Sequence, residues 1–206
     1  MREMAKTTLN RLCTLAVLPA YVAYRLASLV LEPDQAFHGA SQGMSLLPGV
    51  SGEYLRRAFY RLTLEACSDD CCLSFGTVFS KRGARVGRRV YVGTGCTLGL
   101  VTLEDDALLA SNVDVLSGSG QHVFDDPRVP IREQGGEFNR VIVGADTWIG
   151  NRAVVMASVG RGAIVGAGSV VTKAIPERAL AVGSPARVVG WRGEPGAAER
   201  SPSCAS

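Results

Sequence analysis

The stretch VIVGADTWIGNRAVVMASVGRGAIVGAGSVVT, residues 141–172, carries the repeat that decides the fold. Branched residues recur every six positions at Val143, Ile149 and Val155, and the spacing resumes at Val159, Val165 and Val171. A period of six fits neither the 3.6-residue turn of a helix nor the simple alternation of one strand. It is typical of hexapeptide repeats, in which each hexad forms a short strand and a turn, three hexads to a coil.

This pattern predicts an all-β fold, a parallel β-helix of hexapeptide repeats. The branched residue of each hexad should point inward and stack on its equivalents in neighbouring coils. A small residue follows most of these positions, as at Gly144, Gly150, Gly160 and Gly166. Glycine there is expected to let the backbone turn a tight corner.

Composition agrees with a solenoid built on small turns. The chain has 206 residues with 24 glycines and 6% aromatic residues, and its net charge is +3. Residues 1–89 carry 12 basic and 7 acidic side chains, whereas residues 90–206 carry 10 basic and 12 acidic ones. The front of the molecule is therefore the part expected to meet an anionic surface, and no nucleic-acid partner is expected.

The sequence argues against a metal site. Its six cysteines form no C-x-x-C pair, and it has only two histidines, His38 and His122. Such scattered cysteines are typical of reduced intracellular thiols.

The most apolar segment is Leu9–Leu31. Only 13 uncharged residues separate Arg11 from Arg25, fewer than the roughly 20 that a spanning helix needs. Three interpretations stay open: a helix in the membrane interface, a helix packed on the protein or a partner chain, and a spanning or cleaved segment.

The next segment extends this N-terminal unit. Ser45–Gly52 is predicted to be a loop from its Pro and Gly content. Glu53–Ala66 then places apolar residues on one helical face, with Arg56, Arg57 and Arg61 elsewhere on the cylinder. This helix could lie on a lipid surface or cap the open end of the solenoid. Residues 1–66 are therefore predicted to form an apolar and basic helical extension that could contact a membrane.

The β pattern is predicted over residues 67–190 and becomes regular at Val86. Cations cluster on its first turns at Lys81, Arg82, Arg85, Arg88 and Arg89. This cluster is interpreted as a solvated corner or, alternatively, as a site for anionic lipid or polysaccharide. Residues 116–140 break the repeat as a protruding loop of about 25 residues, and such insertions are often functional. The polar tail, residues 191–206, is predicted to be disordered.

His122 is the one histidine of the protruding loop. Imidazole titrates near neutrality, so it can take a proton from a hydroxyl and return it within one turnover. The acidic residues of the loop are weaker candidates for a base because carboxylates have low pKa values. A lone histidine can equally be an ordinary loop residue.

Residues 86–187, about half of the chain, resemble the hexapeptide-repeat acyltransferases, in the branch of galactoside, maltose, nodulation-factor and sugar-cluster O-acetyltransferases. The resemblance rests on four pieces taken as a set: G-x-H at 120–122, VGADTWIG at 143–150, VGAGSVVTK at 165–173 and GSPARVV at 183–189. It implies a left-handed coil, a homotrimer with active sites between subunits, and acyl transfer from coenzyme A.

The resemblance also implies roles for single residues. His122 matches the general base that deprotonates the acceptor hydroxyl for direct attack on the thioester. Trp148 matches a tryptophan near the acceptor, although a core aromatic is the competing interpretation. Five residues match positions that hold acetyl-CoA: Asn151, Ala167, Thr172, Lys173 and Arg187. Lys173 could instead be a solvated turn residue.

The acceptor is less defined than the acyl donor. The short step from Val155 to Val159 and the missing sugar-binding residues upstream of Leu103 both depart from galactoside acetyltransferases. The basic, apolar front favours an acceptor near a membrane, such as a surface polysaccharide or glycolipid precursor. The expected location is the cytoplasm, with peripheral contact to the inner face of the plasma membrane.

Other functions need residues that this sequence lacks. A β-helix carbonic anhydrase needs three metal-binding histidines, and a nucleotidyltransferase needs a nucleotide-binding domain for which the chain has no room. N-acetyl transfer to an amino-sugar, amino acid or drug stays open as an alternative to O-acyl transfer. So does a non-catalytic scaffold at the membrane.

Overall fold

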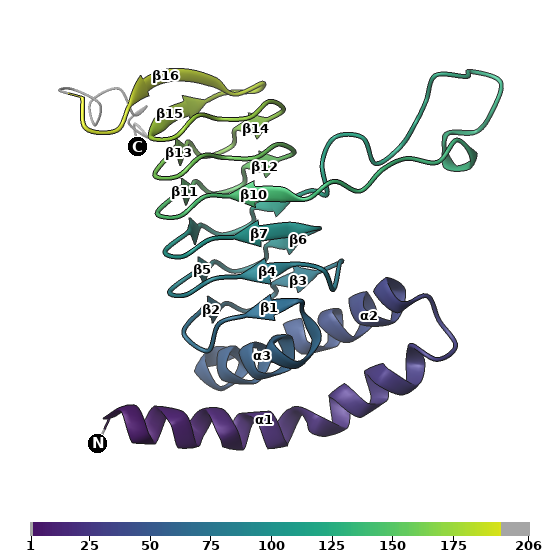
Figure 1. The fold of residues 1–206 in the computed structure, drawn as a ribbon, viewed down its shortest axis with the longest axis vertical. Helices are drawn as coiled ribbons and strands as arrows, with labels where there is room; N and C mark the ends of the chain where they lie inside the picture. The colour runs from purple at the N-terminus through teal and green to yellow at the C-terminus, as the bar shows by residue number, and fades with distance from the viewer. Residues whose placement is uncertain (1, 195–206) are drawn as a thin grey trace.

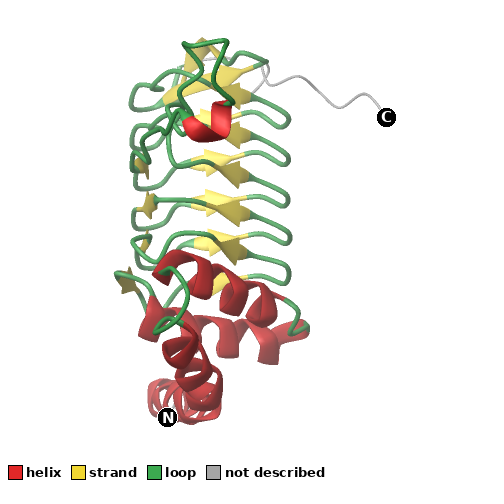
Figure 2. Ribbon diagram, turned by 90° about the vertical axis from the view of Figure 1, so that its right-hand side faces the viewer, coloured by secondary structure: helices red, strands yellow, loops and turns green. Residues whose placement is uncertain are grey.

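The computed structural model describes residues 2–194, and it is a column of stacked β coils standing on three helices (Figures 1 and 2). Its strands form three sheets that are parallel except at the C-terminal end. The first sheet contains β1 (Ala66–Cys67), β4 (Arg85–Val86), β7 (Val101–Leu103) and β10 (Val141–Val143). The second contains β2 (Cys72–Leu73), β5 (Tyr91–Val92), β8 (Leu108–Leu109), β11 (Trp148–Ile149), β13 (Ile164–Val165), β15 (Ala179–Val182) and β16 (Arg187–Trp191). The third contains β3 (Val78–Phe79), β6 (Thr97–Leu98), β9 (Asp114–Val115), β12 (Val154–Val155) and β14 (Val170–Val171).

The predicted parallel β-helix and its register are confirmed. The six branched residues that define the repeat are all buried: Val143, Ile149, Val155, Val159, Val165 and Val171. Strand pairing places each on its equivalent one coil away, as Val155 pairs with Val115 below and Val171 above. Isolated bridges continue the first sheet from Val143 through Val159 to Ile175. The interior is thus a stack of apolar layers.

The glycines after the inward residues serve a different purpose from the one predicted. A Cβ added to Gly150 would lie 2.5 Å from the backbone nitrogen of Ala167, in the next coil. Glycine is therefore required by close approach between coils. The left-handed backbone of the turns falls instead on residues such as Asp146 and Arg152, with φ of 57° and 58°.

One corner of the coil accepts chain of variable length. The spacing between inward residues is six along the first and second corners, for example from Val143 to Ile149 and on to Val155. At the third corner, between the third sheet and the first, the spacing from Val155 to Val159 is four, as it is from Val171 to Ile175. The short step seen in the sequence is therefore a property of this corner, and the protruding loop leaves from it.

Three helices form the N-terminal unit: α1 (Arg2–Ala27), α2 (Pro33–Ser45) and α3 (Gly49–Thr63). The predicted loop over Ser45–Gly52 is shorter than expected, because α3 already begins at Gly49. Helix α2 was not predicted. Glu32 caps it by accepting a hydrogen bond from the Gln35 backbone N–H, and Pro33 starts its first turn. No helix within residues 2–194 is long and apolar enough to cross a bilayer.

Helix α3 covers the open end of the β-helix. Its Arg56 is fully buried, and its Nε donates to the Leu73 carbonyl at 2.9 Å. Arg57 Nη1 donates to the Cys71 carbonyl at 3.0 Å, and its Nη2 donates to Asn10 Oδ1 of α1 at 2.9 Å. Strand β2 is the last of its sheet, so these carbonyls have no further strand to pair with. The two arginines therefore face the coil, and placing them on a lipid surface is wrong.

The opposite end of the column is closed by an antiparallel pair. Strand β16 returns along β15, with Val182 opposite Arg187 and Ala179 opposite Trp191. The strand thus runs through Trp191, the first residue of the predicted tail. Residues 195–206 of that tail lie outside the described residues.

The register predicts the effect of charge on neighbouring residues of β10. Val143 is 0% exposed whereas Ile142, on the outer face, is 42% exposed. Val143→Asp places an unpaired carboxylate among apolar layers and should lower the free energy of unfolding by about 3–5 kcal/mol. Ile142→Asp should change it by less than about 1 kcal/mol. Urea denaturation of both variants gives the comparison, and equal losses would contradict the register.

Candidate functional site

The protruding loop is a paired arm between β9 and β10 (Figure 1). Its two sides are held together by backbone hydrogen bonds, from Asn139 to Ser117, from Glu137 to Gly120 and from Val123 to Gly135. Their lengths lie between 2.8 and 3.0 Å. His122 lies along this paired portion, and its side chain is exposed. The arm therefore holds His122 at a fixed position outside the column, with its imidazole exposed.

Gly136 sets the local packing around His122. Its φ is +156°, and an added Cβ would lie 2.0 Å from the Gln121 carbonyl oxygen and 2.8 Å from the His122 nitrogen. Only glycine allows the two sides of the arm to approach this closely. Gly120, across the arm, has no atom within 4 Å of an added Cβ.

The root of the arm is fixed to the first coils by Arg140. Its Nη1 donates to the Gly83 carbonyl at 2.7 Å, and its Nη2 donates to Glu65 Oε2 at 2.8 Å. Hydrogen bonds from Arg85 and then Arg140 lower the pKa of Glu65 below its usual value. The carboxylate therefore stays ionised to a lower pH than an unpaired glutamate does, and it keeps Arg140 in place.

The residues expected to hold acetyl-CoA occupy two neighbouring corners. Asn151 and Ala167 meet at the second corner, between the second and third sheets, where the Gly168 N–H donates to the Asn151 carbonyl at 2.8 Å. Both residues are exposed. Thr172 and Lys173 follow β14 at the third corner, two coils beyond the corner from which the arm leaves.

Arg187 begins β16, at the end of the column. Its side chain is exposed. The residue before it, Ala186, donates its backbone N–H to the Val170 carbonyl of β14 at 2.8 Å. Arg187 and Lys173 thus flank the two ends of β14. Within the described residues neither has an ion-pair partner, so both cations are available to an anionic ligand.

Trp148 is not a core aromatic. It lies on the outer face of the second sheet and is 50% exposed. Leu108 and Ile164 pair with it from the coils on either side, and Tyr91 continues the row. The row forms an apolar stripe on the second sheet.

His122 and the second-corner residues therefore face different directions within one chain. The arm leaves the third corner and extends away from the column, whereas Asn151 and Ala167 lie at the second corner (Figures 1 and 2). The fold brings Asn151 to Ala167 but does not bring His122 to either of them.

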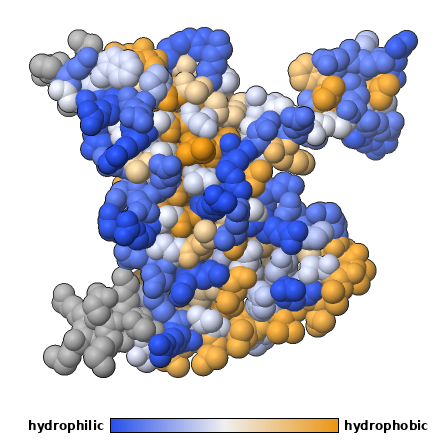
Figure 3. Space-filling model, in the orientation of Figure 1, coloured by the Kyte–Doolittle hydropathy of each residue, from blue (hydrophilic) through white to orange (hydrophobic). Residues whose placement is uncertain are grey.

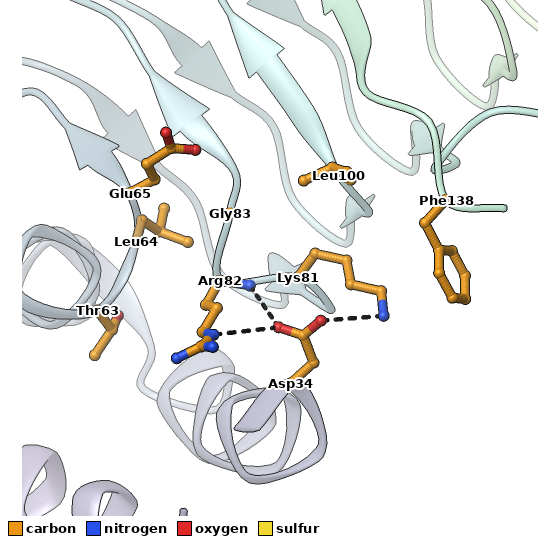
Figure 4. A pocket seen from close by; sticks show the side chains of 9 residues that line it. All are labelled: Asp34, Thr63, Leu64, Glu65, Lys81, Arg82, Gly83, Leu100 and Phe138. Carbon is orange, nitrogen blue, oxygen red and sulfur yellow. Dashed lines mark hydrogen bonds and ion pairs between the residues drawn. The ribbon is translucent and has the colours of Figure 1, made fainter. Parts of the chain in front are cut away.

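A cavity of about 450 Å³ lies at the third corner, beside the root of the arm, and sequence reasoning missed it (Figure 4). We call it the arm-side cavity; it is lined by Asp34, Thr63, Leu64, Glu65, Lys81, Arg82, Gly83, Leu100 and Phe138. Lys81 Nζ lies 3.1 Å from Asp34 Oδ2 and 4.0 Å from the ring centre of Phe138. The cavity thus combines ionic groups with an aromatic face and joins α2, the first coils and the arm.

The basic cluster predicted on the first turns separates into ion pairs. Lys81 and Arg82 meet Asp34, Arg85 meets Glu65, Arg88 meets Asp105 and Arg89 meets Asp106. Each cation therefore has a carboxylate, and the cluster is not one strongly positive surface. Of these five cations, only Lys81 and Arg82 line the arm-side cavity.

Sequence comparison links this architecture to acetyltransferases. A family model described as the hexapeptide repeat of succinyl-transferase matches residues 140–173. A galactoside O-acetyltransferase of Escherichia coli is 34% identical over 110 residues, which cover 50% of this chain and 52% of that protein. A second Escherichia coli protein, named for O-acetyl transfer in lipopolysaccharide biosynthesis, is 30% identical over 121 residues, 55% of this chain and 60% of that protein.

Solved structures show the same fold. A maltose O-acetyltransferase from Clostridium difficile superposes with a TM-score of 0.65 at 22% identity, covering 80% of this chain and 90% of that one. A galactoside acetyltransferase in complex with coenzyme A gives 0.64 at 22% identity, covering 79% and 84% of the two chains. The expected left-handed β-helix agrees with these neighbours.

The predicted resemblance to hexapeptide-repeat acetyltransferases is confirmed for the β-helix. The chain spans about half the length of the galactoside O-acetyltransferase that it matches in sequence. Residues 1–66 precede the segment matched by the family model.

The packing of Gly136 predicts a local effect on the arm. Gly136→Ala should separate Gln121–Val123 from the opposite side and speed amide hydrogen exchange at Val123 and Glu137, with little change in melting temperature. Gly120→Ala is the matched control and should leave both exchange rates unchanged. Equal protection in the two variants would show that the arm does not need this close approach.

Proposed function

We propose that this chain is an acyl-CoA-dependent O-acyltransferase, most simply an acetyltransferase, that acts on a sugar hydroxyl. The carrying observation is the combination of the hexapeptide coils with an arm that presents a single histidine at 120–122. Relatives named as galactoside, maltose and lipopolysaccharide O-acetyltransferases support this assignment. A scaffold would need neither the exposed His122 nor the cations at the end of the column.

His122 acts as the general base. Its neutral imidazole takes the proton of the acceptor hydroxyl while the oxygen attacks the thioester carbonyl. The tetrahedral intermediate then expels the thiolate of coenzyme A, which receives the proton from the imidazolium. The hydroxyl has become an ester, the thioester has become a thiol, and the histidine is neutral again.

Acetyl-CoA lies along the upper coils. Asn151 and Ala167 contact its pantetheine arm, and the Ala167 N–H, which donates no hydrogen bond within residues 2–194, is available to a carbonyl of that arm. Thr172, Lys173 and Arg187 hold the nucleotide end, where the two cations meet phosphate groups.

The complete site requires a neighbouring chain. Because the arm points away from its own second corner, His122 reaches the acetyl-CoA residues of an adjacent subunit in a homotrimer. Exposed apolar side chains on the arm, Phe124 and Ile131 among them, give it a surface to pack on that subunit. Trp148 lies on the acceptor side of the resulting site.

The arm-side cavity receives the acceptor. Sugar hydroxyls can hydrogen-bond to Asp34, Glu65 and Lys81, while the Phe138 ring offers an apolar face to the pyranose. The cavity touches the root of the arm, so an acceptor held there is close to the base of the segment that carries His122.

Helix α1 places the protein on a membrane surface. Exposed apolar side chains recur along one side of this helix: Leu12, Leu15, Leu18, Val22 and Leu26. Figure 3 shows hydrophobic surface along the lower edge of the molecule, where α1 lies in Figure 1. Arg11 and Arg25 are exposed on the same helix. An apolar face bordered by cations fits the interface of an anionic bilayer. The acceptor is accordingly a surface polysaccharide or glycolipid precursor.

His122→Ala should lower the rate of acetyl transfer to a soluble galactoside by about 10²–10⁴-fold, because the acceptor loses its base. The release of coenzyme A thiol measures the rate. His38→Ala removes the other histidine of the chain, on α2, and should leave the rate unchanged. Full activity of His122→Ala at unchanged melting temperature would refute the general-base assignment.

Leu15→Glu tests the membrane face of α1, where Leu15 is 63% exposed. The variant should bind vesicles of phosphatidylcholine and phosphatidylglycerol about tenfold or more weakly, because an apolar contact is replaced by a repelled charge. Val188→Glu, at the far end of the column, is the control and should bind as the parent does. Vesicle sedimentation measures both, and equal binding would contradict the proposal.

A further inference from the structure

A second cavity, of about 380 Å³, adjoins the arm-side cavity. We call it the helix-side cavity; its lining includes Tyr21 and Arg25 of α1, and Ser28 and Leu29 of the turn that follows this helix. It shares Thr63 and Arg82 with the arm-side cavity, so the two are neighbours across the same pair of side chains. Together the two cavities extend from the C-terminal end of α1 to the root of the arm.

Two guanidinium groups face the helix-side cavity with donors to spare. Arg25 Nη1 donates to the Tyr21 hydroxyl at 2.9 Å, and within residues 2–194 no carboxylate pairs with Arg25. Arg82 Nε lies 3.9 Å from Asp34 Oδ1, a long contact, while the other oxygen of Asp34 is 3.1 Å from Lys81 Nζ. Both arginines can therefore offer N–H groups to an anion.

The outer rim of this cavity is apolar. Leu29 and the adjacent Val30 are 80% and 88% exposed, and they continue the apolar band of α1. The order along the surface is thus apolar rim, guanidinium pair, and then a cavity with carboxylates, a lysine and an aromatic ring. That order matches an amphiphile with a hydrocarbon chain, a phosphate and a sugar.

We propose that Arg25 and Arg82 bind the phosphate of a lipid-linked sugar phosphate, which is the acceptor. The hydrocarbon lies along Leu29, Val30 and the bilayer, and the sugar enters the arm-side cavity. This inference rests on the proposed function, which assigns the arm-side cavity to the sugar of the acceptor. A neutral soluble sugar would leave both guanidinium groups unused, whereas a phosphate accepts their paired N–H donors.

Decyl phosphate, below the concentration at which it forms micelles, is the probe, and isothermal titration calorimetry measures its binding. Arg25→Gln and Arg82→Gln should each weaken binding by about tenfold, the usual loss for one charge-assisted hydrogen bond. Arg128→Gln, which removes an exposed cation at the tip of the arm, is the control and should bind as the parent does. Inorganic phosphate should bind the parent at least about tenfold more weakly, since it lacks the hydrocarbon.

Three results would overturn the inference: equal affinity of the parent and both arginine variants for decyl phosphate, equal affinity of the parent for inorganic phosphate, or a loss confined to binding of anionic vesicles. In the last case the arginines serve bilayer headgroups. Acetyl-CoA binding by the same preparations separates this test from the proposed function. A parent that binds acetyl-CoA but not decyl phosphate loses only the lipid-phosphate site.

Discussion

Stacking of equivalent inward residues from coil to coil is the constraint on which the structure depends. It fixes the spacing at two corners and leaves only the third free, where the chain takes four residues after Val155 and an arm after Val115. The arm, residues 116–140, leaves at that corner, and the apolar layers continue without interruption from Val115 to Val155. The arm, its histidine and the arm-side cavity therefore share one edge of the column.

The open end of the stack creates a second requirement, which α3 meets. The carbonyls of Leu73, in the edge strand β2, and of Cys71, just before it, need hydrogen-bond donors. Arg56 and Arg57 of α3 supply them. Helix α1 packs on α3, and its remaining face stays apolar and exposed. The unit that closes the column thus also supplies the surface that we assign to the membrane.

The sequence was sufficient for the coils because Val143 and its equivalents recur at a spacing that only one architecture explains. The sequence did not predict that Arg56 is buried. Helical periodicity shows which residues share a face, but it does not show that α3 is covered on two sides, by α1 and by the coil. The corners of Asn151 and Lys173 follow from the repeat, whereas the arm-side cavity joins residues as distant as Asp34 and Phe138. No local pattern in the sequence encodes that contact.

Thermal unfolding of the full chain with and without acetyl-CoA tests the central claim most directly. Ligand at about 100 times its dissociation constant should stabilise the folded state by about 2.7 kcal/mol, and this gain should shrink in Lys173→Ala and Arg187→Ala. Arg128→Ala should retain the full gain. Unfolding that is unchanged by millimolar acetyl-CoA and by longer acyl-CoAs would contradict the account and leave the β-helix as a scaffold.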